Sequence, residues 1–187
     1  MRMKTGMEQA VYAMLILDRL PGRSTLSAEL LSERLGVSSS YLKKVMRKLV
    51  QAGLVHSTPG IRGGFSLGRR PEAITVYEIY TAVEGQAALY REHGVFSHLF
   101  ADDAMCTESD TCALEALMRQ AENAWANVLK KETLAMLQER VDATYPAHKL
   151  ASLTTWINET TNEGGNTSGT ESKNSSGQQT AGHADKR

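Results

Sequence analysis

The sequence is poor in the residues that mark a secreted or membrane-spanning protein. It has only two cysteines, Cys106 and Cys112, too few for the disulfide framework of a secreted domain. No stretch approaches the roughly 18 apolar residues of a membrane-spanning helix. The apolar N-terminal segment is interrupted by Glu8 and Asp18 and lacks a signal-peptidase site. We therefore expect a cytoplasmic protein without a membrane partner.

Catalytic signatures and aromatic residues are also scarce. The five histidines are scattered, without the i, i+4 pairing of a helical zinc site. The glycines Gly60, Gly63 and Gly64 are followed by neither a helix nor the Lys-Ser/Thr pair of a phosphate-binding loop. Aromatic residues make up 6% of the chain, and no strand carries the aromatic platform that stacks single-stranded bases. The missing zinc and phosphate-binding motifs predict that the protein is not an enzyme, and the missing aromatic platform argues against a binder of single strands.

Charge is abundant but unevenly distributed. The formal net charge is zero, yet residues 1–72 contain twelve basic and five acidic side chains, a net charge of +7. The remaining residues carry the compensating −7. A basic lobe joined to an acidic one favours a polyanion-binding half and a half with a different task.

Three helices are expected in the basic lobe. Apolar residues at helical spacing predict the first over residues 7–20. The second has Ser27 as its N-cap and Gly36 as its left-handed stop. The third follows the Ser38–Ser40 triplet and ends at Gly53.

After Gly53 the spacing of the apolar residues changes from helical to alternating. Residues 54–57 and 64–67 predict two short strands joined by a turn, and a fourth helix follows Thr75 and stops at Gly85. Three helices and then a β-hairpin are the order of a winged helix-turn-helix. We predict a mainly α fold with a small β-hairpin wing, and a DNA-binding domain over residues 1–85.

In a helix-turn-helix the recognition helix enters the major groove with its N-terminal residues. A solvated basic face on a single helix would mean little, but here it coincides with the helix spacing, the glycine-rich hairpin and the local charge. Hydroxyls and lysines can contact bases or phosphates, and an arginine at the hairpin tip can enter the minor groove. The predicted contacts to double-stranded DNA are Ser38, Ser39, Ser40, Tyr41, Lys43, Lys44, Arg47, Lys48 and Arg62.

The acidic half is expected to contain a loop and a long helix. Residues 86–111 show weak periodicity, and Thr111 is a candidate cap for a helix of about five turns. Its apolar stripe includes Leu114, Leu117, Met118, Ala121, Trp125 and Val128. We group residues 86–150 as a second unit. Residues 151–187 are expected to be a disordered tail, because from Asn158 onward the chain has almost nothing apolar to bury.

Several motifs fall in one order that resembles the Rrf2 family of winged-helix regulators. They are Ser39-Ser-Tyr-Leu42, Leu49 to Val55, Gly60 to Leu67 and Ile74 to Gly85. The resemblance covers about residues 1–140. It implies an α-helical homodimer on a pseudo-palindromic operator, usually as a repressor, with the 112–131 helix as the dimer interface.

Members of that family include iron–sulfur and nitric-oxide sensors, and this chain matches their cluster motif only in part. Cys106 and Cys112 resemble the second and third cysteines, but the position of the first, near Phe100, is not a cysteine. Glu8 stands where some relatives use a carboxylate from the other subunit. Two thiolates and Glu8 still leave one ligand short of the usual four. The candidates for the fourth ligand are Glu115, Glu108, Asp103, His93 and His98.

Two other readings of the cysteines remain open. A Cys106–Cys112 disulfide would make the loop a thiol switch without any metal. Alternatively the cysteines sense nothing, and a ligand or a partner protein controls the regulator. In the second case the winged helix would serve as a protein-interaction module.

Overall fold

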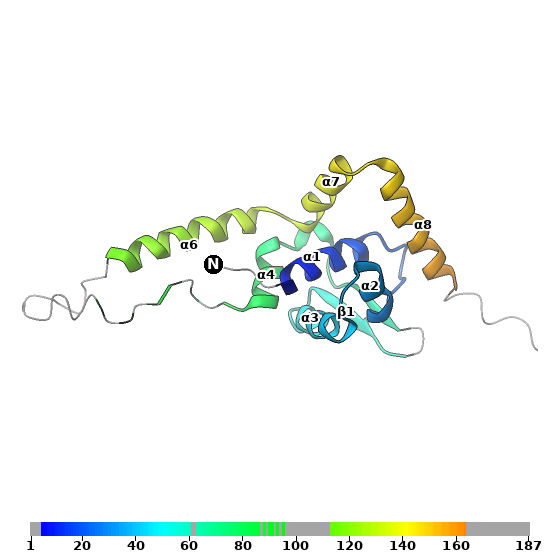
Figure 1. Ribbon diagram of the computed structural model, residues 1–187, viewed down its shortest axis with the longest axis horizontal. Coiled ribbons are helices and arrows are strands. Elements are labelled where there is room, and N and C mark those ends of the chain that lie inside the picture. The colour runs from blue at the N-terminus through cyan, green and yellow to red at the C-terminus, as the bar shows by residue number, and fades with distance from the viewer. Residues whose placement is uncertain are drawn as a thin grey trace, which may run out of the picture.

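The structure is a computed structural model, and it describes residues 5–60, 63–86, 88, 90–91, 93, 95 and 113–163. Its elements run in the order of a winged helix followed by three further helices (Figure 1). They are α1 (Thr5–Asp18), α2 (Ala28–Leu35), α3 (Ser39–Gln51), β1 (Val55–Thr58), β2 (Gly64–Leu67), a 3-10 turn (Pro71–Ala73), α4 (Val76–Glu84), α6 (Ala113–Lys131), α7 (Leu134–Thr144) and α8 (Ala147–Glu163). The predicted fold class is confirmed.

Local signals set the ends of the helices in the N-terminal domain. The Ser27 hydroxyl accepts a hydrogen bond from the Leu30 N–H at 3.2 Å and caps α2. Gly36 follows α2 with a φ of 65°, a left-handed conformation that costs glycine little. Ser27 therefore sets the start of α2, and Gly36 sets its end and the turn to α3.

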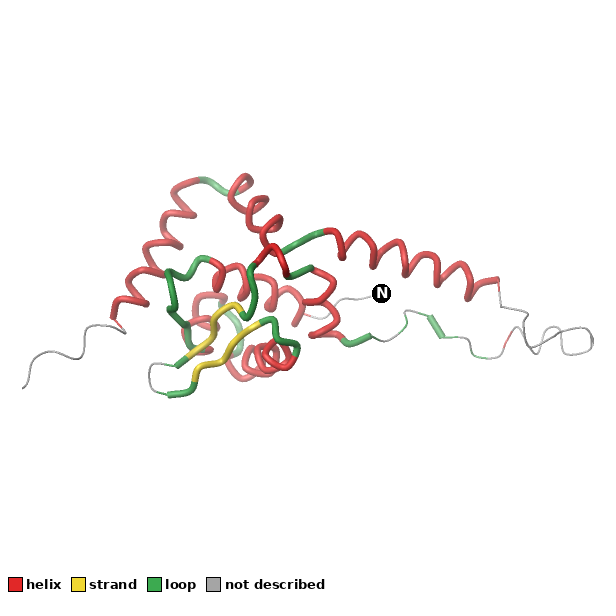
Figure 2. Tube along the Cα trace, turned by 180° about the vertical axis from the view of Figure 1, so that it is seen from behind, coloured by secondary structure: helices red, strands yellow, loops and turns green. Residues whose placement is uncertain are grey.

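The wing is a two-stranded antiparallel sheet attached to the start of α2 (Figure 2). Val55 pairs with Leu67 at one end and Thr58 with Gly64 at the other. Phe65 also exchanges backbone hydrogen bonds of 2.8 and 3.0 Å with Leu26, just before α2. A Cβ on Gly64 would lie 2.6 Å from the Leu26 backbone, so only glycine allows this close approach.

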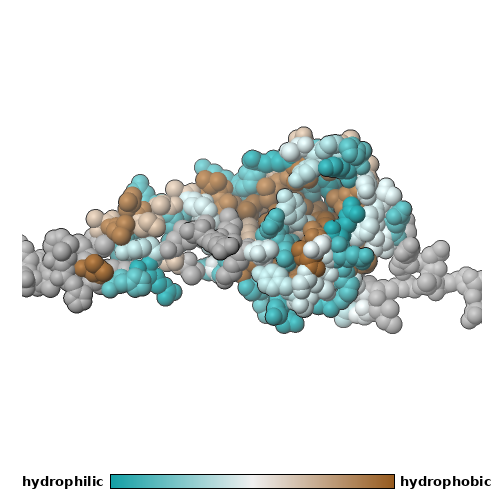
Figure 3. Space-filling model, in the orientation of Figure 1, coloured by the Kyte–Doolittle hydropathy of each residue, from teal (hydrophilic) through white to brown (hydrophobic). Residues whose placement is uncertain are grey.

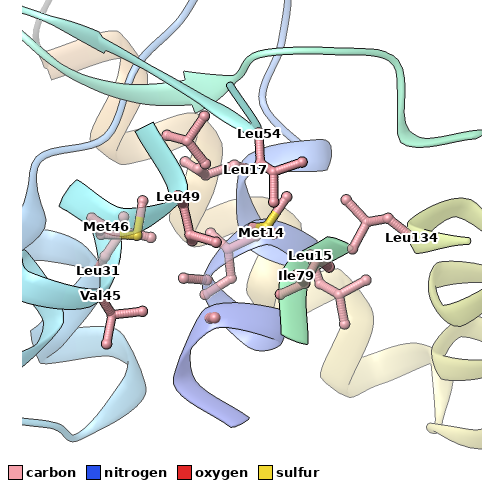
Figure 4. Close-up of a cluster of buried hydrophobic side chains, with 14 of the residues drawn as sticks. Met14, Leu15, Leu17, Leu31, Val45, Met46, Leu49, Leu54, Ile79 and Leu134 are labelled. Atoms are coloured by element: carbon pink, nitrogen blue, oxygen red, sulfur yellow. The ribbon is translucent and has the colours of Figure 1, made fainter. Parts of the chain in front are cut away.

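The core lies where α1, α3 and α4 meet (Figure 4). Met14 on α1, Leu42, Met46 and Leu49 on α3, and Ile79 on α4 are all fully buried. These side chains fix the orientation of α3 relative to the rest of the domain, because close-packed interiors resist displacement. The polar face of α3 is thereby held outward.

The start of α4 carries a capping box. Thr75 accepts from the Glu78 N–H at 3.2 Å, and Glu78 Oε2 accepts from the Thr75 N–H at 2.8 Å. Burial raises the pKa of Glu78, but hydrogen bonds from the Thr75 backbone, Arg69 and the Thr75 hydroxyl outweigh burial and leave the pKa below its ordinary value. The carboxylate form is therefore the stabilising one.

Replacing Glu78 by alanine should lower the free energy of unfolding by about 1 kcal/mol at neutral pH. Because the folded-state pKa is lowered, this stabilisation is present above the unfolded-state pKa and is lost as the pH falls through the folded-state value. Thermal melts of wild type and Glu78→Ala should thus converge below pH 4, roughly where glutamates ordinarily titrate. A difference that persists unchanged in acid would contradict the assigned role of the carboxylate.

The helix α6 extends away from the N-terminal domain (Figures 1 and 2). Its C-terminal end, beside the domain, leads into α7, whose Leu134 N–H donates to the Ile74 carbonyl at 2.9 Å. The Leu134 side chain is fully buried. Within the described part of the chain, no helix is sufficiently long and apolar to cross a membrane.

The expected disorder of residues 151–187 is wrong for residues 151–163, which belong to α8. Ile157 of α8 is 1% exposed, and Leu153 and Trp156 pack on the same core. The sparse apolar residues of α8 lie at helical spacing, so they form one face that is buried against the domain. Residues 164–187 lie outside the described residues.

Candidate nucleic-acid interface

The helix α3 has two opposite faces. Leu42, Val45, Met46 and Leu49 are buried, whereas most of the predicted DNA contacts on this helix are exposed. At 100° per residue, the positions farthest from the buried face are Ser40, Lys44, Arg47 and Gln51. Gln51 is not among the contacts predicted from the sequence, although the same helical spacing identifies it.

The N-terminus of α3 has polar groups and no acidic residue in its first turn. Ser38 makes no capping hydrogen bond, and its hydroxyl lies 3.0 Å from the Ser40 hydroxyl. Ser39 is half-buried, whereas Ser38 and Ser40 are exposed. The first backbone N–H groups and two hydroxyls are therefore available on a helix end that favours anions.

One edge of α3 faces the wing across a groove. The groove has a volume of about 500 Å³ and is lined by Lys43 and Arg47 from α3 and by Ser57 and Thr58 from β1. Lys43 is 2.5 Å from Glu29 of α2, and this hydrogen bond lowers the pKa of the Glu29 carboxyl. Lys43 is thus partly neutralised by its neighbour, whereas Arg47 has no ion pair among the residues described.

The other edge of α3 faces α1 and α4. Lys48 Nζ donates to the Val83 carbonyl at 2.5 Å, at the C-terminal end of α4. The Tyr41 hydroxyl approaches Gly6 of α1 so closely that a Cβ there would lie 2.8 Å from it. Tyr41 and Lys48 therefore connect the recognition helix to its neighbours, and their predicted contacts with DNA stay predictions.

The wing and the loop before α2 add a second basic region. A broad groove of about 870 Å³ between them is lined by Arg23, His56, Arg69 and Arg70, among others. Arg69 is paired with Glu78 at 2.7 Å and Arg70 with Glu72 at 3.4 Å, but Arg23 has no acidic partner among the residues described. Arg23 is not among the contacts predicted from the sequence, because its position beside the wing is a tertiary feature. Arg62, predicted to enter the minor groove, lies outside the described residues.

The apolar residues predicted to form one stripe along α6 differ in their exposure to solvent. Trp125 packs on α4, with its ring centroid 4.6 Å from that of Tyr80. Leu114, Leu117 and Val128 instead are 50%, 60% and 67% exposed. Met118 is half-buried and Ala121 is exposed. Apolar surface is visible along α6 in Figure 3.

Most candidate cluster ligands lie outside the described residues. These are Cys106, Cys112, Asp103, Glu108 and His98. Glu8 is exposed on α1, Glu115 is ion-paired with Arg119 at 2.6 Å, and His93 is exposed. Among the residues that are described, no three His, Cys, Asp or Glu side chains come together as a metal site.

A polar recognition helix, a hydrogen-bonded wing and basic flanks define a DNA-binding transcriptional regulator of the winged-helix class. The sequence profile of the Rrf2 family, described as iron-dependent transcriptional regulators, matches residues 3–140. The chain belongs to the Rrf2 family, and it is a regulator rather than an enzyme.

Individual relatives agree with this assignment. The chain is 43% identical over 150 residues to the HTH-type transcriptional regulator YwgB of Bacillus subtilis, covering 80% of this chain and 92% of YwgB. It is 30% identical over 151 residues to the HTH-type transcriptional regulator IscR of Escherichia coli, covering 79% and 88%. The structure of CymR, the global cysteine regulator of B. subtilis, is similar with a TM-score of 0.58 and 25% identity, over 75% of this chain and 98% of CymR.

Proposed function

We propose that the protein is a homodimeric repressor that binds a pseudo-palindromic operator through α3 and the wing. The observation that carries this proposal is the solvent face of α3, where Ser40, Lys44 and Arg47 lie opposite the buried face. Repression follows from occupancy, because a dimer spanning two half-sites covers DNA that a polymerase would need.

Each part of the surface has a distinct role in this proposal. Lys44 and Arg47 contact base edges or phosphates in the major groove, and Ser38 and Ser40 contact phosphate at the start of α3. Arg23 contacts the backbone beside the wing. Arg62 at the wing tip enters the adjacent minor groove, as sequence analysis predicted.

The binding mode predicts steep salt dependence. Operator duplex would be selected from a random library with the full-length protein, and affinity measured by fluorescence anisotropy over a salt series. Lys44→Ala and Arg47→Ala should each weaken operator binding by about tenfold, since a good base contact is worth about 1–3 kcal/mol. If the lost contact is to a phosphate, the slope of log affinity against log salt concentration should also become smaller by about one.

Lys131→Ala is the matched control, because Lys131 is an exposed lysine at the end of α6, outside the proposed interface. It should leave affinity and slope unchanged. Binding that is weak and independent of salt would contradict the proposal and favour the protein-interaction module. Normal binding by both Lys44→Ala and Arg47→Ala would show that the groove assignment is wrong.

For the signal, we propose that Cys106 and Cys112 respond to redox or iron status. The family description as iron-dependent regulators supports a cluster. The donor set is incomplete, however, since two thiolates and Glu8 leave a fourth ligand unassigned. A reversible disulfide between the two thiols needs no further ligand.

Anaerobic purification followed by absorption spectroscopy and assays of iron and sulfide separates these two signals. A broad band between about 320 and 460 nm with stoichiometric iron and sulfide would establish a cluster. A colourless, iron-free protein whose DNA affinity changes between reduced and oxidised thiols would establish the disulfide. A protein indifferent to both treatments would refute the sensing role of the cysteines.

A further inference from the structure

A cavity of about 270 Å³ lies on the side of the domain opposite α6, between α1, the end of α2, α7 and α8. Figure 1 shows α7 and α8 joined at an angle beside α1 and α2. Apolar side chains such as Ile16, Leu35 and Val141 form most of its wall. Its volume is close to the lower end of the roughly 300–1,000 Å³ typical of small-molecule sites. The site is separate from the DNA-facing surface of α3.

The rim of this cavity is basic. Arg34 of α2, Lys149 of α8 and Arg19, which directly follows α1, line it. Arg19 is ion-paired with Asp142, whereas neither Arg34 nor Lys149 has a carboxylate partner among the described residues. The Arg34 guanidinium also makes a cation–π contact with Trp156 of α8, 5.1 Å from the ring centroid. Two uncompensated cations therefore face one apolar cavity.

The wall also contains one buried polar atom that is short of a partner. Gln138 is only 9% exposed; its Nε2 donates to Asp142 at 3.2 Å, and its Oε1 has no hydrogen-bond partner among the described residues. A buried acceptor without a partner is unfavourable, and a donor from a ligand would remove this penalty. Burial, together with Tyr145 and Glu8, raises the pKa of Tyr12, whose hydroxyl is hydrogen-bonded to Tyr145.

We propose that this cavity binds a small amphipathic anion. Its apolar aromatic or aliphatic body fills the space between α1 and α8, and its carboxylate pairs with Arg34 and Lys149. A ligand that also carries an N–H group, such as an indole, donates it to Gln138. Because α2 also packs on α3, such a ligand contacts the element next to the recognition helix. The site depends on α8, which lies beyond the region matched by the family profile.

The test is calorimetric titration of the full-length protein with indole-3-acetate, 2-naphthoate, 4-phenylbutyrate and octanoate. Each acid is compared with its uncharged primary amide. At least one acid should bind, and at least tenfold more tightly than its amide. Arg34→Gln and Lys149→Gln should each weaken that binding by about tenfold, the equivalent of one charge-assisted contact. Lys131→Gln removes the same charge from the end of α6 and should change nothing.

Failure of all four acids to bind at millimolar concentration would overturn the proposal, as would equal affinity for acids and amides. An equal loss of binding in Lys131→Gln would show that the effect is one of net charge rather than of this cavity. Circular dichroism melts confirm that the glutamine variants are folded, which both are expected to be because Arg34 and Lys149 are exposed. No DNA enters these titrations, so their outcome is independent of the proposed operator binding.

Discussion

Leu117→Glu is expected to convert the proposed dimer into a monomer and to reduce operator affinity by at least a hundredfold. The exposed set Leu114, Leu117 and Val128 lies on one side of α6, a helix of 19 residues in which only Ala126 is buried within a single chain. An apolar stripe of this length in water favours association with an equivalent helix. A glutamate in the middle of that stripe would be buried without a partner.

The loss of DNA affinity follows from the loss of bivalent binding. In a dimer the second α3 engages its half-site at a high effective concentration, and this advantage disappears in a monomer. Light scattering coupled to gel filtration measures the mass, and anisotropy measures operator binding. Ala116→Glu is the matched control, because it adds the same charge at an exposed position away from the stripe. A Leu117→Glu protein that remains dimeric would refute the assigned interface.

Ile157→Ala should lower the free energy of unfolding by about 2–5 kcal/mol, the range for truncating a large buried aliphatic side chain. Ile157 is 1% exposed, and its neighbours on α8 belong to the same apolar cluster as α1. The effect is expected although Ile157 lies beyond the matched family region. Chemical denaturation followed by circular dichroism measures it.

Thr155→Ala is the control for this experiment. Thr155 is on the same helix but exposed, so its replacement should change stability by less than about 0.5 kcal/mol. If Ile157→Ala unfolds at the same denaturant concentration as wild type, α8 does not contribute to the core. The proposed anion site, which needs α8 in place, would then lose its structural basis as well.

The features that were predicted well are those encoded over a few residues. Ser27 and Gly36 cap the two ends of α2, and Thr75 caps the start of α4. Each does so through contacts no more than four positions away along the chain. The wing pairs strands separated by a short turn. Such contacts require little loop-closure entropy, so the local residue types suffice to specify them.

The helix α8 was missed because its signal is weak without its surroundings. Leu150, Leu153, Trp156 and Ile157 have helical spacing, but threonines and asparagines between them dilute the apolar character. Most helical stability in proteins comes from packing an apolar face rather than from propensity. The surface that buries this face lies more than a hundred residues earlier in the chain, on α1 and α2.

By itself, the sequence determined the order of helices and hairpin, the faces of α3 and the regulator class, because periodicity and caps are local. Only the tertiary structure decided how the basic side chains are used. It pairs Lys43 with Glu29 and connects Lys48 to Val83, and it places Arg47 in the groove between α3 and the wing. The physical reason is that the field at a charged group depends on neighbours from distant segments, which only the packing of the core brings together.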